Sequence, residues 1–187
     1  MKQHLLSAWM VLDPLYFSCT RLTYLDETNN IFRVRLTKYK GRELLLSDGT
    51  RIAKNDVLVK IHLHNVRLLR DIYPIKSDVR RARVIYQHVL RSLPGIETFI
   101  QSHKRSDEIK GIIGITTLCK GAERLGFEVF SISNPFYNWL KWVTFLPILL
   151  LSVNGNSLQR LGKKTLPGYL VMSKDKLKLL YSSTHEK

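Results

Sequence analysis

The segment from 57 to 65, VLVKIHLHN, constrains the fold more than any other stretch of the chain. Its residues alternate between two sets, as expected of a β-strand with one buried face. One set is Val57, Val59, Ile61 and Leu63, and the other is Leu58, Lys60, His62 and His64. The strand therefore directs both histidines to the same side of a sheet.

Residues 15–65 are predicted to form an antiparallel β-meander. A second alternating stretch has one apolar and one basic face, with Phe32, Val34 and Leu36 set against Arg33, Arg35 and Thr37. The run Ser47 to Thr50, SDGT, is typical of a tight turn between strands. Asn65 is predicted to cap a short helix that must end before Pro74.

The central part, residues 66–103, is predicted to be helical. Ser77 suits the N-cap of a helix whose apolar residues recur at three- and four-residue intervals. Pro94 and Gly95 should end or kink that helix, and a second helical piece runs from Ile96 to about His103.

The last part, residues 111–181, is predicted to be α/β. A buried strand over 111–117, a helix over 118–125 that Gly126 ends, and a strand over 127–132 resemble a compact βαβ unit. A strand from Gly168 to Met172 and a helix capped by Ser173 follow. The chain is thus expected to be a single α+β domain, residues 1–187, with an N-terminal antiparallel meander, central helices and a C-terminal βαβ-like unit with an apolar amphipathic helix.

That apolar helix is predicted over 136–153, the most hydrophobic stretch of the chain. Its polar residues recur every third position and Pro147 interrupts it, so an amphipathic helix fits better than a bilayer span. It is either a core helix, an interfacial helix or a transmembrane helix. If it lies at an interface, the residues that contact the membrane surface are Trp139, Lys141 and Trp142, with Arg160, Lys163 and Lys164 downstream.

The net charge of +15, from 30 basic and 15 acidic residues, favours polyanionic partners. Residues 1–65, 66–110 and 111–187 contain ten basic residues each, so no basic tail stands out. Cys19 and Cys119 are far apart, which speaks against a disulfide scaffold and a zinc ribbon. The N-terminus lacks a signal-peptide pattern, so we expect a cytoplasmic protein that can also lie at the inner face of the membrane.

Two groups of residues are candidates for a site. His62 and His64 have a spacing that permits two ligands of one metal ion, although histidines that only bond their neighbours have the same spacing. Thr116, Thr117 and Cys119 follow a predicted strand, where they could bind an anion, present a nucleophile or simply cap a helix. The phosphate-loop, dinucleotide-binding, metalloprotease and serine-hydrolase motifs are absent, so no cofactor is expected.

Three segments together resemble the YkoP family of small bacterial proteins: DGTRIAKNDVLVKIHLHN, GITTLCKGAERLGFEV and LPGYLVMSKDKLKLLY. Similar domains occur attached to polysaccharide deacetylases, so the resemblance implies a role in the bacterial envelope or spore. The positions that match the shared pattern are His62, Asn65, Thr116, Gly121 and Gly126. The part AERLGFEV is also similar to the last helix-to-strand step of GNAT acetyltransferases, but their pyrophosphate loop is absent.

The leading expectation is a non-catalytic accessory or binding protein of envelope or spore polysaccharide metabolism, whose basic surface contacts an anionic polymer or membrane. In that hypothesis His62 and Asn65 share a pocket with the loop 116–119. The alternatives are an enzyme with a metal or acyl-transfer site built around His62, His64 and the same loop, and a nucleic-acid-binding protein recognised by charge alone.

Overall fold

The computed structural model describes residues 22–26, 30–116, 119, 121–131 and 168–182. The strands are β1 (Thr23–Tyr24), β2 (Phe32–Lys38), β3 (Leu44–Leu45), β4 (Arg51–Ile52), β5 (Val57–Leu63), β6 (Ile109–Thr116), β7 (Glu128–Ser131) and β8 (Gly168–Ser173). The α-helices are α2 (Asn65–Ile72), α3 (Asp78–Ser102) and α6 (Lys174–Tyr181), and two short 3-10 helices are η1 (Ser106–Glu108) and η2 (Ala122–Leu125).

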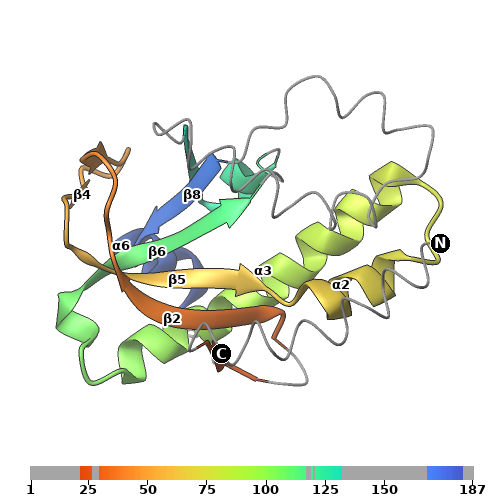
Figure 1. Ribbon diagram of the computed structural model, residues 1–187, viewed down its shortest axis with the longest axis horizontal. Coiled ribbons are helices and arrows are strands. Elements are labelled where there is room, and N and C mark those ends of the chain that lie inside the picture. Colours follow the sequence, from red (N-terminus) through yellow and green to blue (C-terminus); the bar gives the residue numbers. More distant parts are fainter. Residues whose placement is uncertain (1–21, 27–29, 117–118, 120, 132–167, 183–187) are drawn as a thin grey trace.

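A six-stranded sheet in the order β1-β2-β5-β6-β8-β7 forms the centre of the fold, and β3 and β4 form a separate hairpin. In Figure 1 the sheet lies in front, with α3 and α6 behind it. The architecture is α+β, as the sequence patterns predict. The sheet therefore has one face covered by helices and one face that the β3–β4 hairpin covers in part.

Each face of the sheet has its own core. The helix-covered face packs Val34, Val59 and Ile61 against Leu93 and Ile96 of α3. The opposite face packs Leu58, Ile113 and Val171 against the hairpin region, which contributes Tyr39, Leu46 and Ile52. The alternation of β5 is thus used on both sides, with Val59 and Leu58 each fully buried in a different core.

Helix α3 does not end at Pro94, so the predicted division into two helical pieces is wrong. Proline removes only one helical hydrogen bond, and contacts from outside the helix stabilise the turn around it. The Nδ2 of Asn30 donates to the Ser92 carbonyl at 2.9 Å, and the Ile31 N–H donates to the Ser92 hydroxyl at 3.0 Å. Ile96, two residues beyond Pro94, is fully buried.

The helix caps agree with the sequence at two of three positions. Ser77 caps α3 and Ser173 caps α6, and in each case the side chain accepts a hydrogen bond from the N–H three residues on. At α2 the prediction is off by one residue, because His64 occupies the N-cap and Asn65 is the first helical residue. Helix α2 ends at Ile72, before Pro74, as predicted.

The βαβ-like unit contains an inserted strand. Strands β6 and β7 each pair antiparallel with β8, so they run in the same direction with β8 between them. The connection contains the 3-10 turn η2 rather than an α-helix in its described part, and Gly126 ends it with φ of 88° as predicted. Because β8 comes from beyond residue 167, this neighbour could not be read from the local pattern.

The β3–β4 hairpin is held against the start of α6 by Asp48. Its carboxylate accepts hydrogen bonds from the Ser173 hydroxyl and from the Thr50 N–H. Partial burial raises the pKa of Asp48, but these hydrogen bonds and the nearby Lys176 charge outweigh it, so the pKa is lowered overall. The ionised form of Asp48 is therefore the form that the fold stabilises.

The lowered pKa of Asp48 predicts a loss of stability in acid. The contribution is complete above the ordinary aspartate pKa of about 3.9 and is lost as the pH falls through the lower pKa of the folded state. Urea unfolding of the protein and of Asp48→Asn between pH 6 and pH 2.5 measures it. The difference in stability between the two should shrink as the pH falls, and a constant difference would contradict the assignment.

Candidate functional site

A group of basic side chains lies on the sheet face opposite the helices. Strands β2 and β5 are antiparallel, with Arg33 directly opposite His62 and Arg35 directly opposite Lys60. We call these four residues the basic row. The two strands lie side by side in front of α3 in Figure 1. Side chains that are directly opposite in such a pair have Cβ atoms about 4.5–5.5 Å apart.

The alternation of both strands produces this arrangement. Val34 opposite Ile61 and Leu36 opposite Val59 face the helices, and Val34 and Val59 are fully buried. A shift of one residue would bury the cations and expose these apolar side chains, so the hydrophobic core fixes the pairing. Arg33 is only 3% exposed, and Arg35, Lys60 and His62 are half-buried, with Nε of Arg35 and Nε2 of His62 inaccessible to solvent.

An aromatic cluster holds the buried end of the basic row. The guanidinium of Arg33 lies over the Tyr24 ring, 4.8 Å from its centroid, a cation–π geometry. The Nη2 of Arg33 also lies 3.0 Å from the Nε2 of His64. Arginine can only donate, so Nε2 of His64 is the acceptor and a neutral His64 carries its proton on Nδ1.

That proton position affects the cap of α2. Nδ1 of His64 lies 3.5 Å from the backbone nitrogen of Arg67 in the first turn of α2. A protonated Nδ1 cannot accept this hydrogen bond, so the two contacts of His64 exclude one another in the neutral ring. The contact with Arg33 is the shorter of the two.

Of the predicted metal ligands, His62 lies in β5 opposite Arg33, whereas His64 follows the strand as the N-cap of α2 and contacts Nη2 of Arg33. A metal ion on Nε2 of His64 would have to replace the Arg33 guanidinium there. Within the described ranges, no three His, Cys, Asp or Glu residues are grouped as a metal site requires. The two-histidine metal site stays a prediction.

The loop residues Thr116 and Cys119 do not join His62. Lys60 pairs with Ile113 of the parallel strand β6, so Ile113 belongs to the basic-row face and Thr116, three residues on, faces the helices. Cys119 is near Gly168, and its Sγ contacts the Thr116 carbonyl at 3.5 Å. The structure therefore separates the two predicted halves of the pocket by the thickness of the sheet.

The environment of Cys119 also bears on the predicted nucleophile. Burial raises the pKa of its thiol, and a hydrogen bond from the Gly168 backbone opposes this only in part. A raised pKa lowers the fraction of thiolate at neutral pH, and the thiolate is the reactive form. This environment stabilises a neutral thiol.

The remaining candidates lie outside what the structure describes. Asn65 begins α2, but its side chain is not described. The candidates Thr117, Trp139, Lys141, Trp142, Arg160, Lys163 and Lys164 lie outside the described residues, as does the apolar segment 136–153. None of the helices in the described ranges is both long and apolar enough to cross a bilayer.

The sequence patterns indicate the basic face of 33–37 and the histidine strand separately, but not that the two strands pair with each other. Arg35 and Lys60 are 25 positions apart, and no local signal states which residues of two strands will be opposite. A row of this kind can be predicted once two strands are known to pair, if each strand has one apolar face and basic residues on the other face.

The comparisons with known proteins place the chain in a family. The model of the YkoP domain matches residues 2–181. The chain belongs to the YkoP family. It is 52% identical over 182 residues to "Uncharacterized protein YkoP" of Bacillus subtilis (strain 168). The aligned region covers 97% of this chain and 98% of that protein. No solved structure shows a significant match. The predicted resemblance to the YkoP family is thus confirmed.

Proposed function

We propose that this YkoP-family protein is a non-catalytic binding protein of envelope or spore polysaccharide metabolism that holds an anionic polymer on the basic row. The observation that carries the proposal is the pairing of Arg35 with Lys60 next to that of Arg33 with His62. Like charges directly opposite on a sheet repel one another. An anionic polymer bound across both pairs would offset that repulsion.

The spacing of the basic row favours a polymer over a single small ion. Residues two apart on a strand are about 6.6 Å apart along it, so the two cross-strand pairs form two separate cationic positions. A chain with regularly spaced phosphates or carboxylates can occupy both. Arginine stays protonated at all physiological pH values, which suits binding rather than proton transfer.

The test is binding of poly(glycerol phosphate) by calorimetry at low salt, with neutral dextran as the uncharged comparison. The variant is Arg35→Gln Lys60→Gln, and the control is Arg42→Gln Lys54→Gln, which removes the same charge from two exposed residues outside the row. We expect the first variant to weaken binding about tenfold or more, because charged hydrogen bonds contribute about 1.5–3 kcal/mol each. The control should bind nearly as well as the unaltered protein.

Two further measurements sharpen this experiment. Loss of two phosphate contacts should lower the slope of log affinity against log salt by about 2, and the control should leave it unchanged. Urea unfolding of both variants should show that each keeps the fold, so that a loss of binding reports the contact with the polymer. Equal losses of binding in both variants, or tighter binding of single-stranded DNA than of poly(glycerol phosphate), would contradict the proposal.

A further inference from the structure

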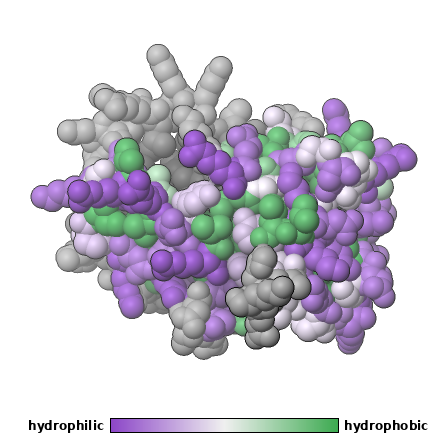
Figure 2. Space-filling view, turned by 180° about the vertical axis from the view of Figure 1, so that it is seen from behind, coloured by the Kyte–Doolittle hydropathy of each residue, from purple (hydrophilic) through white to green (hydrophobic). Residues whose placement is uncertain are grey.

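A second basic surface, away from the sheet face, surrounds the turn between α2 and α3. Two apolar side chains are exposed there: Tyr73, which is 46% exposed, and Val79, which is 78% exposed. Lys76, Arg80 and Arg83 lie among them and are exposed as well. We call these five residues the turn surface. The turn between α2 and α3 lies at the left edge of Figure 2, where hydrophilic and hydrophobic side chains are adjacent.

The charge of this region is strongly positive. Six basic residues occur between 66 and 83, against only two acidic residues, Asp71 and Asp78. Both acids have cationic or imidazole partners, since Asp71 lies 3.1 Å from His88 and Asp78 lies 3.8 Å from Arg81. Cations therefore outnumber acids in this stretch of the chain.

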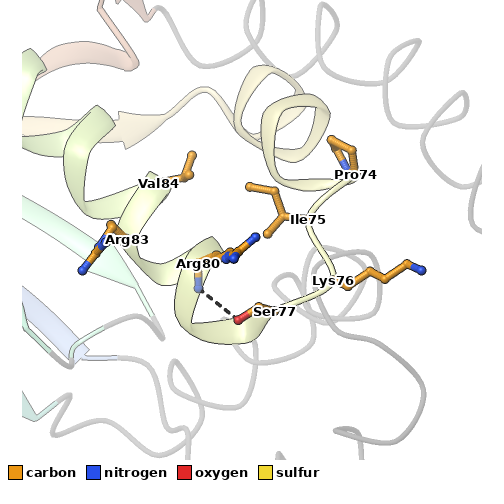
Figure 3. A pocket seen from close by; sticks show the side chains of 7 residues that line it. All are labelled: Pro74, Ile75, Lys76, Ser77, Arg80, Arg83 and Val84. Carbon is orange, nitrogen blue, oxygen red and sulfur yellow. Dashed lines mark hydrogen bonds between the residues drawn. The ribbon is translucent and has the colours of Figure 1, made fainter.

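A cleft of about 660 Å³ lies within this region, and its lining includes Lys76, Arg80 and Arg83 together with Ile75 and Val84. Figure 3 shows that the Arg80 side chain extends toward Ile75, whereas Lys76 and Arg83 extend away from the cleft in opposite directions. The three cations therefore do not converge on one point. Such an arrangement fits several separate anionic groups better than it fits one small anion.

The turn is also well anchored to α3. The buried Arg81 side chain donates from Nε to the Ile75 carbonyl at 2.6 Å. The Ile75 N–H donates to the Ile72 carbonyl at 3.1 Å, which continues from the end of α2. The exposed apolar and basic side chains are consequently presented on a defined backbone before any partner arrives.

We propose that the turn surface docks on an anionic lipid bilayer. Lys76, Arg80 and Arg83 contact the lipid phosphates, and Tyr73 and Val79 enter the headgroup layer, where an aromatic ring with a polar end is favoured. The exposed apolar residues are what favour a bilayer over a soluble polyanion, which offers them no apolar surroundings. This proposal does not depend on polymer binding at the basic row.

Sedimentation with vesicles of phosphatidylcholine containing phosphatidylglycerol tests the proposal, with pure phosphatidylcholine vesicles as the neutral comparison. We expect the protein to sediment with the anionic vesicles at low salt. Arg80→Gln Arg83→Gln should reduce the partition coefficient about 30-fold, from the usual contribution of each basic residue near such a surface. Arg42→Gln Lys54→Gln, with the same change of net charge, should retain most of the binding.

The second variant, Tyr73→Ser Val79→Ser, leaves the net charge unchanged and should also lose vesicle binding, because it removes the apolar contacts. Urea unfolding of each variant confirms that the fold is intact. If Arg80→Gln Arg83→Gln binds vesicles as the unaltered protein does, or if the control loses as much, the turn surface is not the docking site. Unchanged binding by Tyr73→Ser Val79→Ser would also overturn the proposal.

The same proteins separate this proposal from the proposed function. Arg35→Gln Lys60→Gln should still bind anionic vesicles, and Arg80→Gln Arg83→Gln should still bind poly(glycerol phosphate). A protein that binds the polymer but no vesicles contradicts the membrane proposal alone, and one that binds vesicles but no polymer contradicts the proposed function alone.

Discussion

A Gly111→Ala variant is expected to lose about 3 kcal/mol of folding stability, the upper part of the range for an overpacked core. A Cβ atom at position 111 would lie 2.3 Å from the Met172 carbonyl oxygen and 3.0 Å from the Ser173 Cα. Both atoms belong to the backbone of β8, which pairs with β6 through Gly111 and Ser173. The contact can only be relieved by moving one strand away from the other.

Gly114 of the same strand provides the matched control. The atom nearest to a Cβ added at Gly114 would be Cγ1 of Ile61, at 3.2 Å. This side-chain atom can shift by a few tenths of an ångström. Alanine also reduces the freedom of the unfolded chain, which favours folding by about 0.4–1 kcal/mol. Gly114→Ala should therefore change the stability by less than about 1 kcal/mol. Urea unfolding measures both variants, and equal losses would contradict the β6–β8 packing.

An Asn30→Ala variant is expected to cost about 2–4 kcal/mol, because two buried hydrogen bonds are lost at once. Asn30 is 7% exposed, and its Oδ1 accepts from the Phe32 N–H at 2.8 Å while its Nδ2 donates to Ser92 of α3. The substitution leaves the buried Phe32 N–H without this acceptor. Asn30→Asp keeps an acceptor for the Phe32 N–H and loses the donor to the Ser92 carbonyl. The part of the destabilisation that comes from an unsatisfied Phe32 N–H should therefore be smaller than in Asn30→Ala.

Gly95 allows a sharper check of the same contact. A Cβ on Gly95 would lie 2.5 Å from Nδ2 and 3.7 Å from Cγ of Asn30. Gly95→Ala should thus destabilise the unaltered protein, yet stabilise the Asn30→Ala variant by up to about 1 kcal/mol, since alanine favours a helix over glycine. A double-mutant cycle in urea gives the coupling. Additive effects would show that Asn30 and Gly95 do not meet.

These contacts explain why α3 continues through Pro94 and Gly95, against the local prediction. Intrinsic propensity counts the bond lost at proline and the flexibility of glycine, which together disfavour a helix. It cannot count Asn30, which lies 62 residues before Ser92 and approaches so closely that position 95 has room only for glycine. The glycine that reads as a helix breaker is a packing residue.

The basic row has a similar origin. The sequence alternation shows that the basic residues of β2 and of β5 each lie on one face of their strand. Because the apolar faces of both strands must be buried in the same core, the basic residues of both strands lie on the same side of the sheet. Their opposition, Arg35 to Lys60 and Arg33 to His62, is a matter of register. The hairpin between them, which is held at its tip by Asp48, and the burial of Val34 and Val59 select that register.

The amino-acid sequence by itself determined the local features of this protein: the faces of β2 and β5, the caps at Ser77 and Ser173, and the stop at Gly126. These depend on residues a few positions apart, which a periodic pattern records. Only the tertiary structure decided that β8 lies between β6 and β7, and that Thr116 faces away from His62. Such relations join residues that are distant in the chain, and they are settled by which pairing buries the most apolar surface.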